Sequence, residues 1–249
     1  MISLISIGDG SIASLTLGAI KTLDEAKHVL LQTDAVPCAQ YLKEQGIAFE
    51  TLDDCFAQAQ SFEALCLACA DRLLASQEVV FGALGDLFSN RIAQGVLALA
   101  KERGVAVRVL SGQSGTLGAI VAAGGFGERV TITPASGLDP CGLDVSGVIC
   151  VSEVSSKWIA SEVKLALSSL YGDEKQVCLV TGEQVLHILL YELDAQQHYD
   201  YRTCVVVLPQ PLIEQERFTY CDLIRVIEQL RAPDGCPWDA EQTHESIKH

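Results

Sequence analysis

The sequence is short of positive charge. Its 17 Lys and Arg residues face 32 Asp and Glu residues, which gives a formal net charge of −15 at pH 7. Because a nucleic-acid groove neutralises phosphates with clustered Lys and Arg, we expect no nucleic-acid partner. The sequence also lacks any apolar run near the ~18 residues of a membrane span, and no basic segment precedes the first apolar residues, as a secretory signal requires. We therefore expect no membrane partner and a cytoplasmic location.

A disulfide framework is not expected either, although the sequence has 10 cysteines. Most of them lie inside apolar runs, where a free Cys behaves as a small hydrophobe. A chain of 249 residues that is 49% hydrophobic can form one large or two modest cores without covalent staples. Cys66 and Cys69 have Cys-x-x-Cys spacing, but both fall on the apolar face of a predicted helix, which favours packing over a metal or redox role. Cys236 and His244 would supply only two of the ~4 ligands that zinc needs.

What the sequence does have is a set of apolar runs that end in glycine-containing turns. Strands are expected over Ile2–Ile7, Val79–Ala83 and Val105–Leu110. Such continuous runs are typical of strands buried on both faces of a parallel sheet, and ligands bind beyond the carboxyl ends of such strands. Gly85 would let the backbone approach a ligand, and Asp86 would place a carboxylate at the rim. The sequence therefore predicts a cleft for a small molecule.

Alternating strand and helix patterns place this cleft in an α/β fold. Helices are expected at Leu15–Ala26, Cys38–Gln45, Phe62–Ala75, Ser89–Arg103 and Leu117–Ala123, and from Ser155 onward. The other strands are expected at His28–Leu31, Phe49–Leu52, Val130–Thr133, Gly147–Val151, Gln176–Val180, His187–Tyr191 and Cys204–Leu208. Short links between the last strands favour antiparallel pairing. We thus expect a parallel-sheet domain at residues 1–113 and a mixed-sheet domain at residues 114–212.

Residues 213–249 have a different character. Phe218, Cys221, Ile224, Ile227 and Leu230 recur on one face of an expected helix, which a proline turn follows at Pro233. Trp238 is expected to anchor packing. We assign this segment as a linker helix and the start of a further domain.

Several motifs resemble those of the tetrapyrrole (corrin and porphyrin) methylase family. They are the glycine-rich turn at Gly8-Asp9-Gly10, Gly85-Asp86 with Phe88, Ser111-Gly112-Gln113-Ser114, Trp158 through Lys164, and Tyr191-Glu192-Leu193-Asp194. The resemblance implies a two-domain α/β fold, S-adenosylmethionine bound between the domains, a homodimer, and methyl transfer to a small-molecule acceptor such as a tetrapyrrole. It implies cofactor contacts at Asp9, Leu84, Gly85, Asp86, Ser89, Ser114, Gly115, Val151 and Gly182. No catalytic residue is assigned, because methyl transfer from a sulfonium depends mainly on alignment of donor and acceptor.

The sequence departs from the family pattern in two turns. The family's first turn usually reads Gly-x-Gly-x-Gly-Asp, whereas this sequence reads Ser6-Ile7-Gly8-Asp9-Gly10-Ser11, and Leu87 stands where the family has proline after Gly-Asp. Other interpretations also stay open. Ser114 fits a helix N-cap, and Gly85-Asp86 fits an ordinary turn. A dinucleotide-binding turn would need a third glycine. Glu153, Glu162 and Asp194 are expected as solvated or capping acids, with the cleft wall as the lesser alternative.

The C-terminal segment is similar to the opening of a MazG nucleoside triphosphate pyrophosphohydrolase domain. The similarity lies in Leu230 through Asp239, with its Cys-Pro-Trp-Asp, and in Gln242-Thr243-His244-Glu245-Ser246. The family's Mg²⁺-binding carboxylates lie further along than residue 249, so we expect this chain to be part of a longer protein, and any pyrophosphohydrolase activity to belong to that parent. The alternative function is thus a non-catalytic dimerising module of a MazG-type enzyme, with a cleft blocked by side chains such as Leu87. A third, weaker possibility is a nucleotide-handling enzyme.

Overall fold

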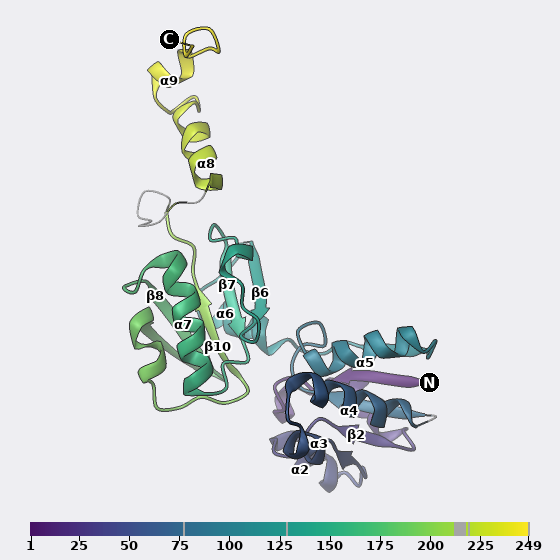
Figure 1. Ribbon diagram of the computed structural model, residues 1–249. Coiled ribbons are helices and arrows are strands. Elements are labelled where there is room, and N and C mark those ends of the chain that lie inside the picture. The colour runs from purple at the N-terminus through teal and green to yellow at the C-terminus, as the bar shows by residue number, and fades with distance from the viewer. Residues whose placement is uncertain (77, 128, 212–217, 219, 249) are drawn as a thin grey trace.

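The computed structural model describes residues 1–76, 78–127, 129–211, 218 and 220–248, which form two lobes and a C-terminal helical segment (Figure 1). The first lobe is built on a five-stranded sheet with the order β3-β2-β4-β1-β5, and every pairing in it is parallel. Its strands are β1 (Ile2–Ser6), β2 (Val29–Leu31), β3 (Glu50–Thr51), β4 (Val79–Ala83) and β5 (Val107–Leu110). The expected parallel sheet is confirmed, and β1 lies between β4 and β5.

Helices cover both faces of this sheet, as a sheet with buried strands requires. One face packs against α1 (Leu17–Asp24) and α2 (Pro37–Glu44), and the other against α4 (Phe62–Leu74) and α5 (Arg91–Glu102). Two short elements were not expected from the sequence, namely η1 (Ile12–Ser14) and α3 (Asp53–Gln58). In α3 the carboxylates of the first turn stabilise the helix N-terminus.

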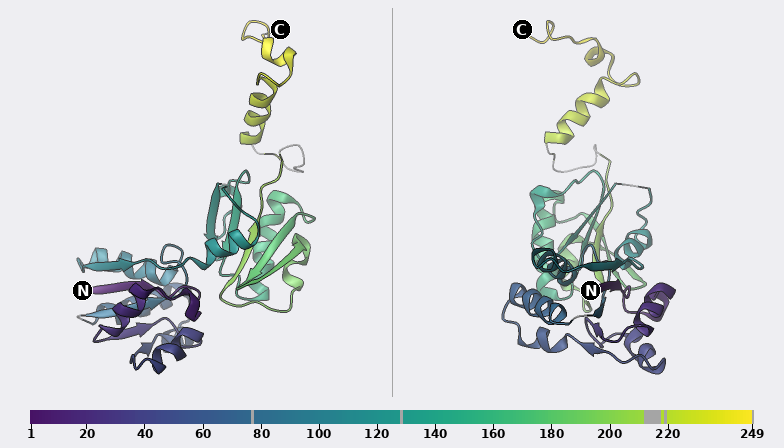
Figure 2. Two further views of the ribbon diagram at one scale, coloured as in Figure 1. Left: turned by 180° about the vertical axis from the view of Figure 1, so that it is seen from behind. Right: turned by 90° about the vertical axis from the view of Figure 1, so that its right-hand side faces the viewer.

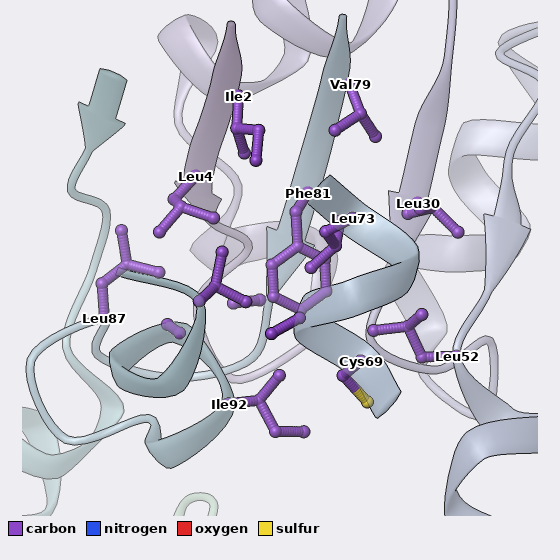
Figure 3. Close-up of a cluster of buried hydrophobic side chains, with 14 of the residues drawn as sticks. Ile2, Leu4, Leu30, Leu52, Cys69, Leu73, Val79, Phe81, Leu87 and Ile92 are labelled. Atoms are coloured by element: carbon purple, nitrogen blue, oxygen red, sulfur yellow. The ribbon is translucent and has the colours of Figure 1, made fainter. Parts of the chain in front are cut away.

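The core between the sheet and the α4–α5 pair is centred on Phe81, whose side chain is fully buried (Figure 3). Cys69 belongs to this cluster, and burial raises the pKa of its thiol, so it stays neutral and acts as a packing residue. Leu87 also points into this core and is only 6% exposed. The expectation that Leu87 blocks the cleft is therefore wrong, because this apolar side chain is buried between the sheet and the helices instead.

The second lobe has a mixed five-stranded sheet with the order β6-β7-β10-β8-β9. Its strands are β6 (Val130–Pro134), β7 (Val148–Ser152), β8 (Gln176–Thr181), β9 (Gln184–Leu189) and β10 (Thr203–Val207). β6 and β7 are parallel, and the other pairs are antiparallel, as expected. α7 (Lys157–Tyr171) and η3 (Leu190–Ala195) cover one face and α6 (Gly115–Ala122) the other, while η2 (Pro140–Gly142) precedes β7.

The strand expected at His187–Tyr191 has different bounds in the structure. β9 begins three residues earlier, at Gln184, and the chain leaves the ladder after Leu189. The Leu189 N–H donates to Glu192 Oε2 at 2.9 Å, which caps η3, so Tyr191 belongs to this 3-10 helix and not to the strand. The apolar run Ile188-Leu189-Leu190 continues past the end of the strand, so the sequence pattern alone did not mark that end.

The C-terminal segment contains α8 (Tyr220–Leu230) and α9 (Pro237–Glu241), which extend away from the second lobe (Figures 1 and 2). Arg225 ties α8 to the loop before β7 by donating to Ser146 Oγ at 2.8 Å. Trp238, expected as a packing anchor, is 69% exposed, so that expectation is wrong.

The domain ranges 1–113, 114–212 and 213–249 remain predictions, and the boundary between 212 and 213 lies outside the described residues, as does the side chain of Cys221. In the described part of the chain, no helix combines the length and the apolar character needed to cross a bilayer.

Candidate functional site

Three strand exits of the first lobe meet at one buried hydroxyl, that of Ser6. Ser6 Oγ accepts a hydrogen bond from the Gly8 N–H at 3.1 Å and donates one to the Gly85 carbonyl at 2.7 Å. The Gly85 N–H donates to the Gly8 carbonyl at 2.6 Å, which fastens the turn after β1 to the turn after β4. A Cβ on Gly112, after β5, would lie only 2.8 Å from Ser6 Oγ, so this turn also packs on Ser6. The expected convergence of these three turns is confirmed.

Ser6 occupies the position where the family pattern has its first glycine. The residue is 2% exposed and ends a regular strand, so the site needs no glycine conformation there. Instead, the hydroxyl satisfies backbone groups of two turns that would otherwise be buried without partners. Sequence reasoning missed this role, because a serine at the end of a strand carries no distinctive signal.

The turns border a cavity of about 430 Å³ that opens between the two lobes. Asp9, Leu84, Gly85, Asp86, Ser89, Gly115 and Gly182 line it. These are seven of the residues to which the family resemblance assigned cofactor contacts. The volume falls within the ~300–1,000 Å³ typical of small-molecule sites.

Two other expected site residues lie elsewhere. Ser114 is the N-cap of α6, where its side chain accepts a hydrogen bond from the Leu117 N–H, so the N-cap interpretation is confirmed. Val151 is fully buried in the core of the second lobe, and it is the next residues of the chain, Ser152 and Glu153, that reach the cavity. Neither the Ser114 nor the Val151 side chain lines the cavity.

Gln32 and Asn90 hold the turn after β4 in place through side-chain hydrogen bonds. Gln32 Oε1 accepts hydrogen bonds from the Leu84 N–H at 3.1 Å and from Asn90 Nδ2 at 2.8 Å. Asn90 Nδ2 also donates to the Leu84 carbonyl at 2.8 Å, and Asn90 Oδ1 caps α5 through the Ala93 N–H. The Leu84 N–H is thus already paired within the protein, whereas its carbonyl keeps a second lone pair. The N-cap position of Asn90 was the available sequence signal for this support.

The carboxylates on the glycine-turn side are held by local hydrogen bonds. Burial acts to raise the pKa of Asp9, but hydrogen bonds from Ser11 outweigh it and lower the pKa, so Asp9 is ionised at neutral pH. Asp86 Oδ1 accepts from the Phe88 N–H at 3.0 Å, which is the turn role considered from the sequence. Both acids nevertheless line the cavity.

The second lobe closes the cavity through two contacts with the first. Tyr201 Oη donates to the Asp9 carbonyl at 2.9 Å, across 192 positions of sequence. Arg91 donates to Ser136 Oγ at 2.9 Å. Arg202 also lines the cavity, and its guanidinium pairs with Asp200 at 2.8 Å. None of these second-lobe residues was identified from the sequence, because their roles depend on how the lobes are placed.

Of the three acids left open by the sequence, Glu153 and Glu162 line the cavity, whereas Asp194 pairs with Lys164 at 2.6 Å. Burial raises the pKa of Glu153, and the positive charge of Arg91 acts against this rise. The described residues around the cavity include no histidine and no lysine. Acidic, hydroxyl, amide and apolar side chains line the cavity, and this arrangement can hold and align a small molecule.

Comparison with known proteins agrees with this architecture. A family model described as Tetrapyrrole (Corrin/Porphyrin) Methylases matches residues 1–133. An uncharacterized protein of Bacillus subtilis (strain 168), YabN, is 30% identical over 270 residues, which cover 99% of this chain and 53% of that protein. The chain thus spans about half the length of this relative. A nucleoside triphosphate pyrophosphohydrolase/pyrophosphatase MazG of Thermotoga maritima (strain ATCC 43589 / DSM 3109 / JCM 10099 / NBRC 100826 / MSB8) is 56% identical over 27 residues, 11% of either chain.

Two solved structures share the fold. A uroporphyrin-III-C-methyltransferase from Thermus thermophilus has a TM-score of 0.59 and 18% identity, covering 84% of this chain and 99% of that one. A cobalt precorrin-4 methyltransferase, CbiF, has a TM-score of 0.57 and 17% identity, covering 82% of this chain and 93% of that one. At these identities the likeness establishes the fold, with its parallel first sheet and mixed second sheet.

Proposed function

The chain belongs to the tetrapyrrole methylase family, and we propose that it binds S-adenosylmethionine or S-adenosylhomocysteine in the cavity between its lobes and acts as a methyltransferase-like domain. The observation that carries this proposal is the meeting of the three strand exits at Ser6, which leaves Gly85 and Gly115 on the wall of a cavity of about 430 Å³. A fold with this topology binds ligands at such an edge.

The residues present fit this cofactor. Gly85 has φ of +70°, and no protein atom lies within 4 Å of a Cβ placed on it, so ligand atoms can approach its backbone closely. Four carboxylates (Asp9, Asp86, Glu153 and Glu162) and two guanidiniums line the cavity, and this excess of negative charge suits a cationic ligand. Asp9, ionised at neutral pH, would stand near the glycine turns as part of that negative field.

When bound, the cofactor would supply an electrophilic methyl group. The chain's own contribution would be alignment and exclusion of water. Gly85 and Gly115, which have no side chains, would let the cofactor pack closely against these turns, and Gln32 and Asn90 would keep the Leu84 turn rigid. The contacts of Tyr201 and Arg91 across the lobes would fix the opposite wall. Alignment of this kind accounts for much of the acceleration in reactions between two bound molecules.

Isothermal titration with S-adenosylhomocysteine tests the proposal. We expect saturable binding of one ligand per chain and no displacement by NAD⁺ or ATP, which represent the dinucleotide-binding and nucleotide-handling alternatives. Absence of heat at millimolar S-adenosylhomocysteine would contradict the proposal, and competition by NAD⁺ or ATP would favour the alternatives.

The second candidate function is a non-catalytic dimerising module of a longer MazG-type pyrophosphohydrolase. The short MazG match and the exposed apolar residues of α8, such as Leu223 and Ile227, favour it. It predicts a dimer by light scattering that persists without cofactor, together with no S-adenosylhomocysteine binding. Hydrolysis of nucleoside triphosphates would then occur in the longer parent and not in this chain.

A further inference from the structure

A second group of residues also lines the cavity, and we call this group the far wall. It consists of Phe56 from α3, Arg91 at the start of α5, Ser136 after β6, Glu153 after β7, and Ile159 and Glu162 from α7. Family resemblance assigned cofactor contacts to none of these residues. If the cofactor occupies the glycine-turn side, the far wall is the part of the cavity left for the acceptor, so this inference rests on the proposed function.

The far wall is poor in positive charge. It carries two carboxylates and one guanidinium, that of Arg91, which donates to Ser136 Oγ at 2.9 Å. The other arginine of the cavity, Arg202, is paired with Asp200 through two hydrogen bonds, of 2.8 and 3.3 Å. Sites that recognise several carboxylates use several Arg or Lys side chains. The charge of this cavity is therefore unsuited to a polycarboxylate.

Glu153 is the distinctive residue of the far wall. Its φ is +62°, and no other non-glycine residue in the described part of the chain has a positive φ. Such a backbone costs free energy and persists only where the surrounding structure imposes it. Here the end of β7 imposes it, since the Val154 N–H donates to the Thr203 carbonyl and the Ser155 N–H to the Glu153 carbonyl. The fold thus holds an acidic residue against the cavity at a position that glycine would occupy with less strain.

The carboxylate of Glu153 keeps its capacity to accept hydrogen bonds. Among the described residues, no hydrogen bond or ion pair engages this carboxylate; burial raises its pKa, and the charge of Arg91 acts against this rise. Glu162 differs in this respect, because its Oε1 already accepts from Trp158 Nε1 at 3.2 Å. A half-buried carboxylate without a donor is stabilised by a ligand that brings one.

We propose that the acceptor at this site is an uncharged or cationic compound that donates an N–H or O–H hydrogen bond to Glu153, and that the far wall rejects polycarboxylates. Phe56 and Ile159 would contact the apolar part of such an acceptor. Selection then follows from a difference in affinity: the donor satisfies Glu153, whereas an added carboxylate meets an unpaired negative charge.

A pair of planar probes of similar size and opposite charge, benzamidinium and benzoate, tests this selection. Their affinities would be measured by ligand-observed NMR titration, with the protein saturated by S-adenosylhomocysteine. We expect benzamidinium to bind about tenfold or more tightly than benzoate, as a charge-assisted contact predicts. Glu153→Gln should bring the ratio to about one, because it keeps the shape and removes the charge. Glu162→Gln should lower the ratio less.

Glu102→Gln is the matched control, since Glu102 is an exposed acid at the far end of α5 and outside the cavity. It should retain the wild-type ratio, and circular dichroism should confirm that all variants fold. Equal or tighter binding of benzoate, or a ratio that survives Glu153→Gln, would overturn the inference. Repeating the titration without S-adenosylhomocysteine separates the two proposals: a Glu153-dependent preference in a protein that binds no S-adenosylhomocysteine would refute the cofactor assignment and leave the far-wall assignment standing.

Discussion

Replacing Gly85 with alanine adds one methyl group at the wall of the cavity. Gly85 has φ of +70°, and an added Cβ meets no protein atom within 4 Å, so the substitution creates no clash inside the protein. Gly46, which follows α2, shares both properties, with φ of +79° and open space around an added Cβ, but it does not line the cavity. Gly46→Ala is therefore a matched control that reproduces the backbone effect without the effect on a ligand.

The cost to stability should be the same for the two variants. A left-handed conformation costs a non-glycine residue about 1–2 kcal/mol, and the smaller conformational freedom of alanine in the unfolded chain returns about 0.4–1 kcal/mol. We expect a net loss of about 1 kcal/mol in the free energy of unfolding for Gly85→Ala and for Gly46→Ala alike, measured by urea denaturation.

The affinity for S-adenosylhomocysteine should differ between Gly85→Ala and Gly46→Ala. A methyl group forced into a well-packed contact costs about 1–3 kcal/mol, so Gly85→Ala should weaken S-adenosylhomocysteine binding about 10- to 100-fold by isothermal titration. Gly46→Ala should bind like the wild type. If the two variants bind equally well, the backbone of Gly85 does not contact the ligand, and the assignment of the glycine-turn side to the cofactor is refuted.

Three further outcomes follow from the packing and charges. Phe81→Ala should lose about 3–5 kcal/mol of unfolding free energy, because Phe81 is fully buried at the centre of its cluster (Figure 3); a loss below 1 kcal/mol in urea would contradict that packing. Burial raises the pKa of Glu153 above 4.5, so protonated Glu153 contributes to the free energy of unfolding. This contribution is complete below pH 4.5 and is lost as the pH rises through the pKa of the folded state. Glu153→Gln should therefore gain in urea midpoint relative to wild type from pH 4 to pH 8, and a constant difference would refute this. Hydrogen bonds from Ser146 and Arg129 lower the pKa of Asp144 from 3.8 to about 2, so Asp144→Asn should cost less than about 1 kcal/mol at pH 7, and this difference should fade as the pH falls from about 4 toward 2.

Much of the fold could be predicted from the apolar runs in the sequence. The expected bounds of β4, Val79–Ala83, match the structure, and most other strands and helices were placed within a few residues. These elements are set by short-range patterns of apolar, glycine and capping residues, which a sequence displays directly. Short elements such as α3 were not predicted, because a few residues show too little periodicity to identify a helix.

The candidate site was predictable only in part, and for a physical reason. Glycine turns such as Gly85 could be identified because positive φ and close approach favour glycine there. That the cofactor contacts them remains a prediction. The roles of Ser6, Gln32 and Asn90 were missed, since their hydrogen bonds join segments that are distant in sequence.

By itself, the sequence determined the alternation of strands and helices, the parallel first sheet and the glycine exits, because these depend on neighbouring residues along the chain. The tertiary structure decided that β1 lies between β4 and β5, that Tyr201 reaches Asp9, and that Glu153 is held against the cavity in a left-handed conformation. Lateral strand order and contacts between lobes come from pairing of remote segments, and no local pattern records which remote segments will meet.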